Sequence, residues 1–258
     1  MDDLFNLTGT VAIVTGGAGA IGRTIALALA KYGADVVVTS RNLSKLEAVA
    51  SEIRGLGRKA LAIASDVTDE KSVVSMVDRV VKEFSHIDIL VNGAGVALRK
   101  SAVDTTVDDW RQVMELNTLG TFICCKTVGK VMIQQKGGKI INISSIRGRF
   151  GVPSFGAAYC PSKGGVDSLT RTLACEWGQY NIYVNALAPS VIRTELTRTL
   201  FEDPVRARNF ASQFPLGRVA ELDDIIGPTI FLASKASGFV SGQVIYVDGG
   251  GSAGFMYR

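Results

Sequence analysis

The sequence of 258 residues has little of what metal centres and disulfide frameworks need: one histidine, four cysteines and six prolines. No two cysteines show the C-x-x-C spacing, and a single histidine excludes a multi-histidine metal site. A Ser-His-Asp triad could be built only around His86, which we expect to be a surface or cap residue. We expect the cysteines to be reduced, buried fillers, and Cys160 is of interest because it adjoins Tyr159.

Charge and long apolar runs are scarce as well. The net charge of +4 is spread along the chain without a basic run, so we predict no nucleic-acid and no membrane partner; a small anionic ligand would suffice to explain it. No stretch reaches the roughly 18 to 20 apolar residues that span a bilayer. The first residues, MDDLFNLTGT, lack the basic and apolar regions of a signal peptide, which predicts a cytoplasmic protein.

What the sequence does have is a regular alternation of two patterns. Short apolar runs rich in β-branched residues are separated by segments of helical period, which is typical of strand-helix-strand units in a parallel sheet. The runs lie at 10–15, 34–40, 59–67, 87–95, 139–145, 183–189 and 243–250, and the helical segments at 21–33, 43–57, 70–84, 106–117, 118–135 and 157–178. This predicts a single α/β domain over residues 1–258, a doubly wound Rossmann fold of about seven parallel strands with helices on both faces.

A glycine-rich turn follows the first predicted strand and opens the first helix. Residues 17–22, GAGAIG, fit the pattern G-x-G-x-x-G, and residues 15–22 also read Thr-Gly-x-x-x-Ala-x-Gly. Glycines also serve tight turns that bind nothing, but at this position backbone N–H groups and a helix N-terminus can cradle a pyrophosphate. We therefore predict a dinucleotide site that includes Thr15, Gly16, Gly17, Gly19, Ala20, Ile21 and Gly22.

The end of the second predicted strand bears on the choice of cofactor. An NAD site generally has an acidic side chain there for the ribose 2′-hydroxyl, whereas a 2′-phosphate favours cationic or neutral donors. The strand ends in VVVTSRN, which supplies Ser40 and Arg41 and no carboxylate. Because a guanidinium can grip a phosphate, we predict NADP(H), with NAD(H) as the alternative if Arg41 only points to solvent.

Tyr159 and Lys163 are four residues apart in a segment of helical period. Residues at this spacing share a helix face, so the ammonium can favour the ionised phenol and let Tyr159 act as an acid or base near neutral pH. Two ordinary exposed residues on a helix can have the same spacing. Other motifs in the sequence are therefore needed to identify Tyr159 and Lys163 as a catalytic pair.

Such motifs lie along the chain. They are Asp66 after the third strand, NGAG at 92–95, Asn117, NISS at 142–145 and the segment from Pro189 to Thr194. In this order and spacing, from residue 9 to residue 250, the chain resembles the short-chain dehydrogenase/reductase family. Ala20, Gly93 and Ser190 depart from the more common family residues, and we expect no loss of binding from Ala20.

The resemblance implies hydride transfer between a nicotinamide and the carbon of a secondary alcohol or ketone. Tyr159 would move the proton, Ser145 would hydrogen-bond the same oxygen, Lys163 would hold the nicotinamide ribose and lower the Tyr159 pKa, and Asn117 would anchor a proton-carrying water. Ser144 remains the alternative serine, because Tyr159 lies 14 residues after Ser145, where 13 is common. Asp66 and Val67 would border the adenine and Thr194 the carboxamide; the other cofactor residues would be Asn92, Gly93, Ala94, Gly95, Pro189, Ser190, Val191 and Ile192.

Several cations lie on loops that this fold places at the carboxyl ends of strands. They are Arg99 with Lys100, Arg147, Arg149 and Arg193. If one of them faces the pocket, a polar or anionic small-molecule substrate fits better than a steroid; otherwise they are solvated loop charges. The layout is similar to sugar-acid and polyol dehydrogenases of the gluconate 5-dehydrogenase type, and nearly as similar to 3-oxoacyl-(acyl carrier protein) reductases.

Two further expectations follow from the resemblance. Some proteins of this fold bind a dinucleotide without catalysis, as sensors, but such a protein would lack the tyrosine or the lysine, and both are present here. Relatives of this type usually form tetramers through the tyrosine-bearing helix, the helix before it, and the last helix and strand. We therefore expect a homotetramer.

Overall fold

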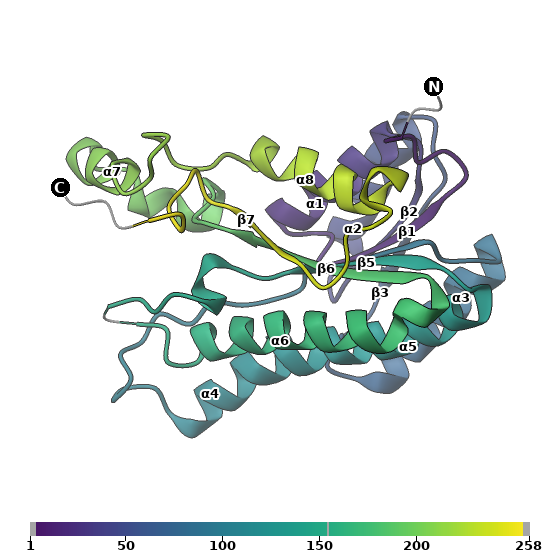
Figure 1. The fold of residues 1–258 in the computed structure, drawn as a ribbon, viewed down its shortest axis with the longest axis horizontal. Coiled ribbons are helices and arrows are strands. Elements are labelled where there is room, and N and C mark those ends of the chain that lie inside the picture. The colour runs from purple at the N-terminus through teal and green to yellow at the C-terminus, as the bar shows by residue number, and fades with distance from the viewer. Residues whose placement is uncertain (1–3, 154, 255–258) are drawn as a thin grey trace.

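The order of the strands determines where a ligand can bind. The computed structural model describes residues 4–153 and 155–254. Seven parallel strands lie in the order β3-β2-β1-β4-β5-β6-β7, which confirms the predicted doubly wound fold (Figure 1). Their bounds are β1 (Val11–Thr15), β2 (Asp35–Ser40), β3 (Ala60–Ala64), β4 (Ile89–Asn92), β5 (Gly138–Ile143), β6 (Ile182–Pro189) and β7 (Val244–Val247). The direction of winding reverses between the paired strands β1 and β4, so a crevice is expected at their carboxyl ends.

Helices cover both faces of this sheet, and each face has its own apolar core. One core contains side chains from α1 (Ala20–Lys31), α2 (Leu43–Gly55) and α8 (Ile226–Ala233). The other contains side chains from α3 (Glu70–Phe84), α5 (Gly120–Gln135) and α6 (Tyr159–Trp177). Two short helices, α4 (Val107–Met114) and α7 (Pro204–Ala211), lie toward the left of Figure 1, and α4 also contacts α6.

Local sequence explains why these elements form. All five residues of β1 are buried, as expected for a strand covered on both faces. On α3 the buried residues Val73, Met76, Val77 and Val80 recur at helical spacing. The same helix begins where the Asp69 side chain accepts a hydrogen bond from the Lys71 backbone N–H. Period and capping therefore agree on the position of the helix.

The predicted boundary between two helices at residues 117 and 118 is wrong. Helices α4 and α5 follow one another through a π-helical turn, Glu115–Leu119, without a break. A π-helical turn contains one more residue than an α-helical turn, so the apolar repeat shifts its phase there. In the sequence this shift looks like the end of one helix and the start of another. The short helix α7 and the turn Glu195–Leu200 before it were not predicted either.

Within residues 4–153 and 155–254, no helix is both long and apolar enough to cross a bilayer, and no group of His, Cys, Asp and Glu side chains is arranged to hold a metal ion. His86 lies at the surface, with Nε2 3.2 Å from an Asp88 carboxylate oxygen. Cys124 and Cys125 are buried, which agrees with the prediction, whereas Cys175 is exposed.

Candidate active site

The glycine-rich turn forms a tight cradle beside β4. Gly16 has a φ of +67°, and a Cβ there would lie 2.7 Å from the backbone oxygen of Gly93. The Thr15 hydroxyl accepts hydrogen bonds from the N–H groups of Gly93 and Ala94 at 3.1 and 3.2 Å. A Cβ on Gly22 would collide with the Gly16 backbone, so α1 starts in close contact with the turn. Because Gly16 and Gly22 have no side chains, the backbone of the turn can pack closely against β4 and the start of α1.

The first turn of α1 is open to an anionic ligand. Its N-cap is Gly19, and no described side chain accepts a hydrogen bond from the first N–H groups of this helix. Free N–H groups at a helix N-terminus favour phosphate. The cradle and the helix end without a side-chain cap have the features that a pyrophosphate site needs, so the predicted dinucleotide site stays a prediction at this position.

The ends of β2 and β3 lie side by side and carry the residues predicted for the far end of the cofactor. Asp66 Oδ1 accepts hydrogen bonds from Thr68 N and Oγ1 at 3.0 and 2.8 Å. These bonds, together with the charge of Arg41, hold the pKa of Asp66 below its usual value. Arg41 itself is exposed, and Ser40 at the end of β2 is half-buried. The guanidinium is thus free to meet a phosphate.

Tyr159 begins α6, and Lys163 follows one turn later in a buried position. The Lys163 ammonium donates to the Ile143 carbonyl at 2.7 Å and lies 6.0 Å from the centre of the Tyr159 ring. Burial lowers the pKa of Lys163 to about 8, while the charge of Asp167 acts in the opposite direction. The ammonium therefore lies between the end of β5 and the Tyr159 ring.

The predicted lowering of the Tyr159 pKa by Lys163 needs correction. Burial raises the pKa of this phenol, and the contributions that lower it come from a hydrogen bond with Ser145 and from the charge of Arg147. Desolvation of the phenolate therefore outweighs both of these in the protein alone.

The structure distinguishes the two candidate serines by their partners. Burial raises the pKa of Tyr159 and Ser145 acts against that shift, while the Ser145 hydroxyl accepts a hydrogen bond from Arg147 N at 3.2 Å. Ser144 turns the other way, and its hydroxyl donates to the Lys163 carbonyl at 3.4 Å. Ser145 is followed by the short helical turn Ile146–Gly148.

Asn117 lies in the π-helical turn and ties three segments together. Its side chain accepts from Val96 N at 2.8 Å and donates to Val96 O and Ser162 Oγ, each at 2.9 Å. The loop after β4 is thereby fixed to α6 next to Lys163. A Cβ on Gly95 would lie 3.1 Å from the Asn117 oxygen and 3.5 Å from the Lys163 ammonium, so the space there is narrow.

A buried polar chain below the crevice was missed by sequence reasoning. Asn92 donates to the Asn142 side chain at 2.9 Å, and Asn142 donates to Thr170 Oγ1 at 2.9 Å. Among the described residues, Asn92 Oδ1 has no hydrogen-bond partner. Asn142 stands inside the NISS motif, so its place in the motif was the available signal. These hydrogen bonds fix the ends of β4 and β5 relative to α6.

The predicted substrate cations separate into two groups. The charge of Arg147 acts on Tyr159 and Cys160 against the effect of burial, which raises the pKa of both, and the Arg147 guanidinium donates to Gly151 O at 2.7 Å. The others are engaged elsewhere: Arg193 with Glu221 at 3.1 Å, Lys100 with Asp109 at 2.7 Å, Arg149 over the rings of Phe150 and Tyr246, and Arg99 over the ring of Phe155.

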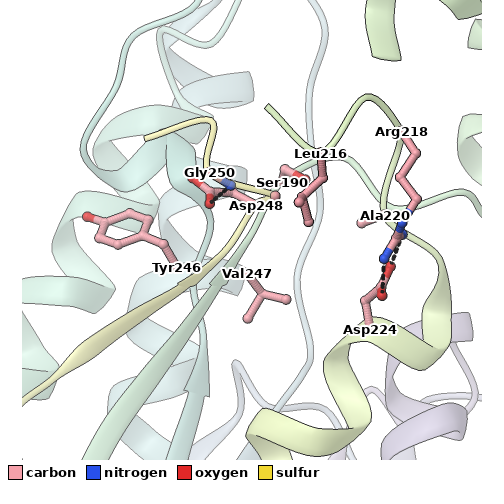
Figure 2. Close-up of a pocket in the computed structure, with 10 residues that line it drawn as sticks. Ser190, Leu216, Arg218, Ala220, Asp224, Tyr246, Val247, Asp248 and Gly250 are labelled. Atoms are coloured by element: carbon pink, nitrogen blue, oxygen red, sulfur yellow. Dashed lines mark hydrogen bonds and ion pairs between the residues drawn. The ribbon is translucent and has the colours of Figure 1, made fainter. Parts of the chain in front are cut away.

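The segment after β6 was predicted to bind the cofactor, with Thr194 at the carboxamide. Ser190 N donates to Val247 O at 3.1 Å, Ile192 bridges to Ala220, and Thr194 caps the following turn. Between this segment and the residues after β7 lies a cavity of about 230 Å³. Figure 2 shows the Arg218–Asp224 pair on one side of it and Asp248 on the other. Ser190 lines this cavity and Tyr159 does not, so the cavity does not contain the predicted catalytic tyrosine.

Comparison with known proteins decides the family. The protein-family model described as enoyl-(acyl carrier protein) reductase matches residues 16–252. Gluconate 5-dehydrogenase of Gluconobacter oxydans (strain 621H) is 38% identical over 248 residues, covering 96% of this chain and 96% of the relative. The chain belongs to the short-chain dehydrogenase/reductase family. It is therefore an oxidoreductase of the short-chain alcohol dehydrogenase and ketoreductase type.

Solved structures of short-chain dehydrogenases agree with this assignment. A gluconate 5-dehydrogenase from Burkholderia cenocepacia J2315, in complex with NADP and tartrate, has a TM-score of 0.94 and 37% identity, covering 98% of this chain and 99% of that one. An NAD+-bound xylitol dehydrogenase has a TM-score of 0.87 and 32% identity, covering 93% and 97%. Both nicotinamide dinucleotides are thus found in structures similar to this one.

Proposed function

We propose that this enzyme uses NADP(H) to interconvert a secondary alcohol and a ketone on a polar sugar acid or polyol. The observation that carries the proposal is the placement of buried Lys163 one helical turn after Tyr159, with Ser145 acting on the same phenol, at the carboxyl edge of the sheet that also holds the glycine cradle. The similar proteins named for gluconate and xylitol support the substrate class. A non-catalytic sensor would not need the tyrosine, lysine and serine assembled in this way.

In this mechanism NADP(H), when bound, supplies or accepts the hydride. During reduction Tyr159 donates its phenolic proton to the carbonyl oxygen, and during oxidation the phenolate takes a proton from the hydroxyl. Ser145 hydrogen-bonds the same oxygen and stabilises the charge that develops there. Lys163 holds positive charge close to the phenol, and Asn117 anchors the water that returns the proton.

The proposed preference for NADP(H) rests on the end of β2. Arg41 is exposed beside Asp66, and no carboxylate stands at residues 39–42. A similar structure that holds NADP supports this preference, and a similar structure with NAD+ marks the alternative. Fluorescence titration with NADPH and NADH tests it directly. Tighter binding of NADH would contradict it.

Arg147 is the proposed recognition group for an anionic substrate. Replacing it with Gln should raise the KM for gluconate by roughly tenfold to a hundredfold, because a hydrogen bond to a charged group contributes about 1.5 to 3 kcal/mol. The KM for an uncharged polyol such as xylitol should change little. As a control, Arg193→Gln should have a smaller effect, since Arg193 pairs with Glu221. Equal losses for gluconate and xylitol in Arg147→Gln would show that the charge does not select the substrate.

A second candidate is reduction of a 3-oxoacyl group on a carrier protein or on coenzyme A. The description of the matching family model, which names an acyl carrier protein, favours it. Parallel assays with gluconate, xylitol and a 3-oxoacyl thioester separate the two. Turnover confined to the thioester would replace the sugar-acid proposal.

We also propose a cytoplasmic homotetramer. Four cysteines without disulfide partners support the compartment. An apolar groove of about 620 Å³ on α4, α5 and α6 supports the assembly. Its lining includes Trp110, Leu119 and Phe122, which are 40%, 45% and 41% exposed in the single chain. Large apolar side chains gathered on one surface favour contact with another copy of the chain.

Phe122→Glu should therefore break the assembly into smaller species, measured by sedimentation velocity. An unpaired carboxylate buried at an apolar contact costs at least about 2 kcal/mol. The matched control is Val74→Glu on α3, where the side chain is 39% exposed and lies outside the groove. A tetramer that survives Phe122→Glu would refute this use of the groove.

A further inference from the structure

Asp167 is a buried carboxylate directly behind the catalytic residues. It lies one helical turn after Lys163 on α6, and 5% of its surface is exposed. Among the described residues, its Oδ1 atom is buried without a hydrogen-bond partner. Charged side chains are almost never buried in this way unless they are paired or have a function. The burial of the Asp167 carboxylate therefore suggests that this residue has a function.

The surroundings of Asp167 connect it with Lys163 on one side and with the segment that carries Ser145 and Arg147 on the other. Burial raises the pKa of the Asp167 carboxyl, and Ser144, the neighbour of Ser145, acts in the opposite direction. Its Oδ2 atom lies 2.5 Å from the position that a Cβ on Gly148 would occupy, so the carboxylate packs against the turn that carries Arg147. Its charge also raises the pKa of Lys163 against the effect of burial.

We propose that Asp167 is a positioning residue: its carboxylate keeps the Lys163 ammonium charged in a buried site and anchors the turn that presents Ser145 to Tyr159. This inference rests on the proposed function, because it assumes that Lys163 acts as a cation in the reaction. The role explains why a carboxylate stands where an apolar side chain would pack more favourably.

The charges around Asp167 allow the effect to be assigned. Within the described part of the chain, Asp167 is the one charged group that acts on Lys163. The groups that act on Asp167 are Ser144 and the cations Arg171 and Lys163 on α6. Tyr159 is acted on by Arg147 and Cys160 instead. Removing the Asp167 charge should therefore change the ionisation of Lys163 before that of Tyr159.

The decisive variant is Asp167→Asn, which removes the charge and keeps nearly the same side-chain shape. In protein with ¹⁵N-labelled lysine and no cofactor, the Nζ signal of Lys163 is assigned by its loss in Lys163→Arg. Its titration midpoint should fall by about one pH unit in Asp167→Asn. Glu176→Gln, which removes an exposed carboxylate from the same helix, should leave the midpoint in place.

Kinetics and stability complete the test. In the reduction direction, the alkaline fall of kcat should move to lower pH by the same amount in Asp167→Asn, with little change in KM. Burial raises the pKa of Asp167, so the wild-type protein loses stability as pH rises from the ordinary carboxyl range through that raised value. Asp167→Asn should lack this loss and have an equal or higher Tm at neutral pH.

The outcomes separate the two proposals. A shifted Lys163 midpoint without turnover on any substrate would support this inference and count against the proposed function. An unchanged midpoint in an active enzyme would overturn the inference and leave the proposed function standing. If Asp167→Asn lowered the Tm but left the Lys163 midpoint and the pH profile of kcat unchanged, Asp167 would have only a packing role. That result would also overturn the inference.

Discussion

Tyr159→Phe should lower kcat/KM by about a hundredfold to ten-thousandfold, which is the usual contribution of a positioned acid or base. The substitution removes only the phenolic oxygen, which is the group proposed to exchange a proton at the substrate oxygen and is the group on which Ser145 acts. The ring, the start of α6 and the cradle stay in place, so the dissociation constant for NADPH should remain close to the wild-type value.

Steady-state rates with gluconate and NADP+, together with fluorescence titration of NADPH, measure both quantities. Tyr32→Phe is the matched control, because Tyr32 is 44% exposed and follows α1, outside the site. Loss of NADPH binding in Tyr159→Phe would mean that the residue has a structural role. Retained turnover would remove it from the chemistry.

Arg41→Asp is expected to reverse the cofactor preference. The guanidinium supplies the charged donors for a 2′-phosphate, and losing two such hydrogen bonds should weaken NADPH binding by roughly a hundredfold or more. The introduced carboxylate also repels the phosphate and can accept from the 2′-hydroxyl of NADH. NADH affinity should therefore rise while NADPH affinity falls.

The ratio of the two dissociation constants is the quantity to measure. Lys45→Asp provides the control, because it makes the same change of charge at an exposed position near the start of α2. A general electrostatic effect would appear in both variants. If Arg41→Asp kept the wild-type ratio, Arg41 would be a solvated side chain, and the preference would have another source.

The fold could be predicted because its information is local. Each strand of the parallel sheet is a short, buried, β-branched run, and each helix repeats apolar residues at its own period. The π-helical turn at Glu115–Leu119 could not be predicted in this way, since it depends on Asn117 bonding to Val96 and Ser162. Those partners lie 21 and 45 residues away along the chain.

The motifs of the site were predictable, but the energetics of its groups were not. The spacing of Tyr159 and Lys163 placed both at one end of α6, yet it carried no information about desolvation, which raises the pKa of the phenol. Four loop arginines were equivalent in the sequence, and only their packing singled out Arg147. Asp167 escaped notice because a carboxylate on a helix reads as an exposed residue until the turn at Gly148 is folded over it.

Single-turnover mixing of the wild-type protein, saturated with NADP+, with gluconate tests the central claim most directly. NADPH absorbance should appear, the signal should be absent in Tyr159→Phe, and NAD+ at the same concentration should give a slower or smaller rise. Tight NADP+ binding without any NADPH signal from gluconate or xylitol, but with oxidation of NADPH by a 3-oxoacyl thioester, would contradict the account.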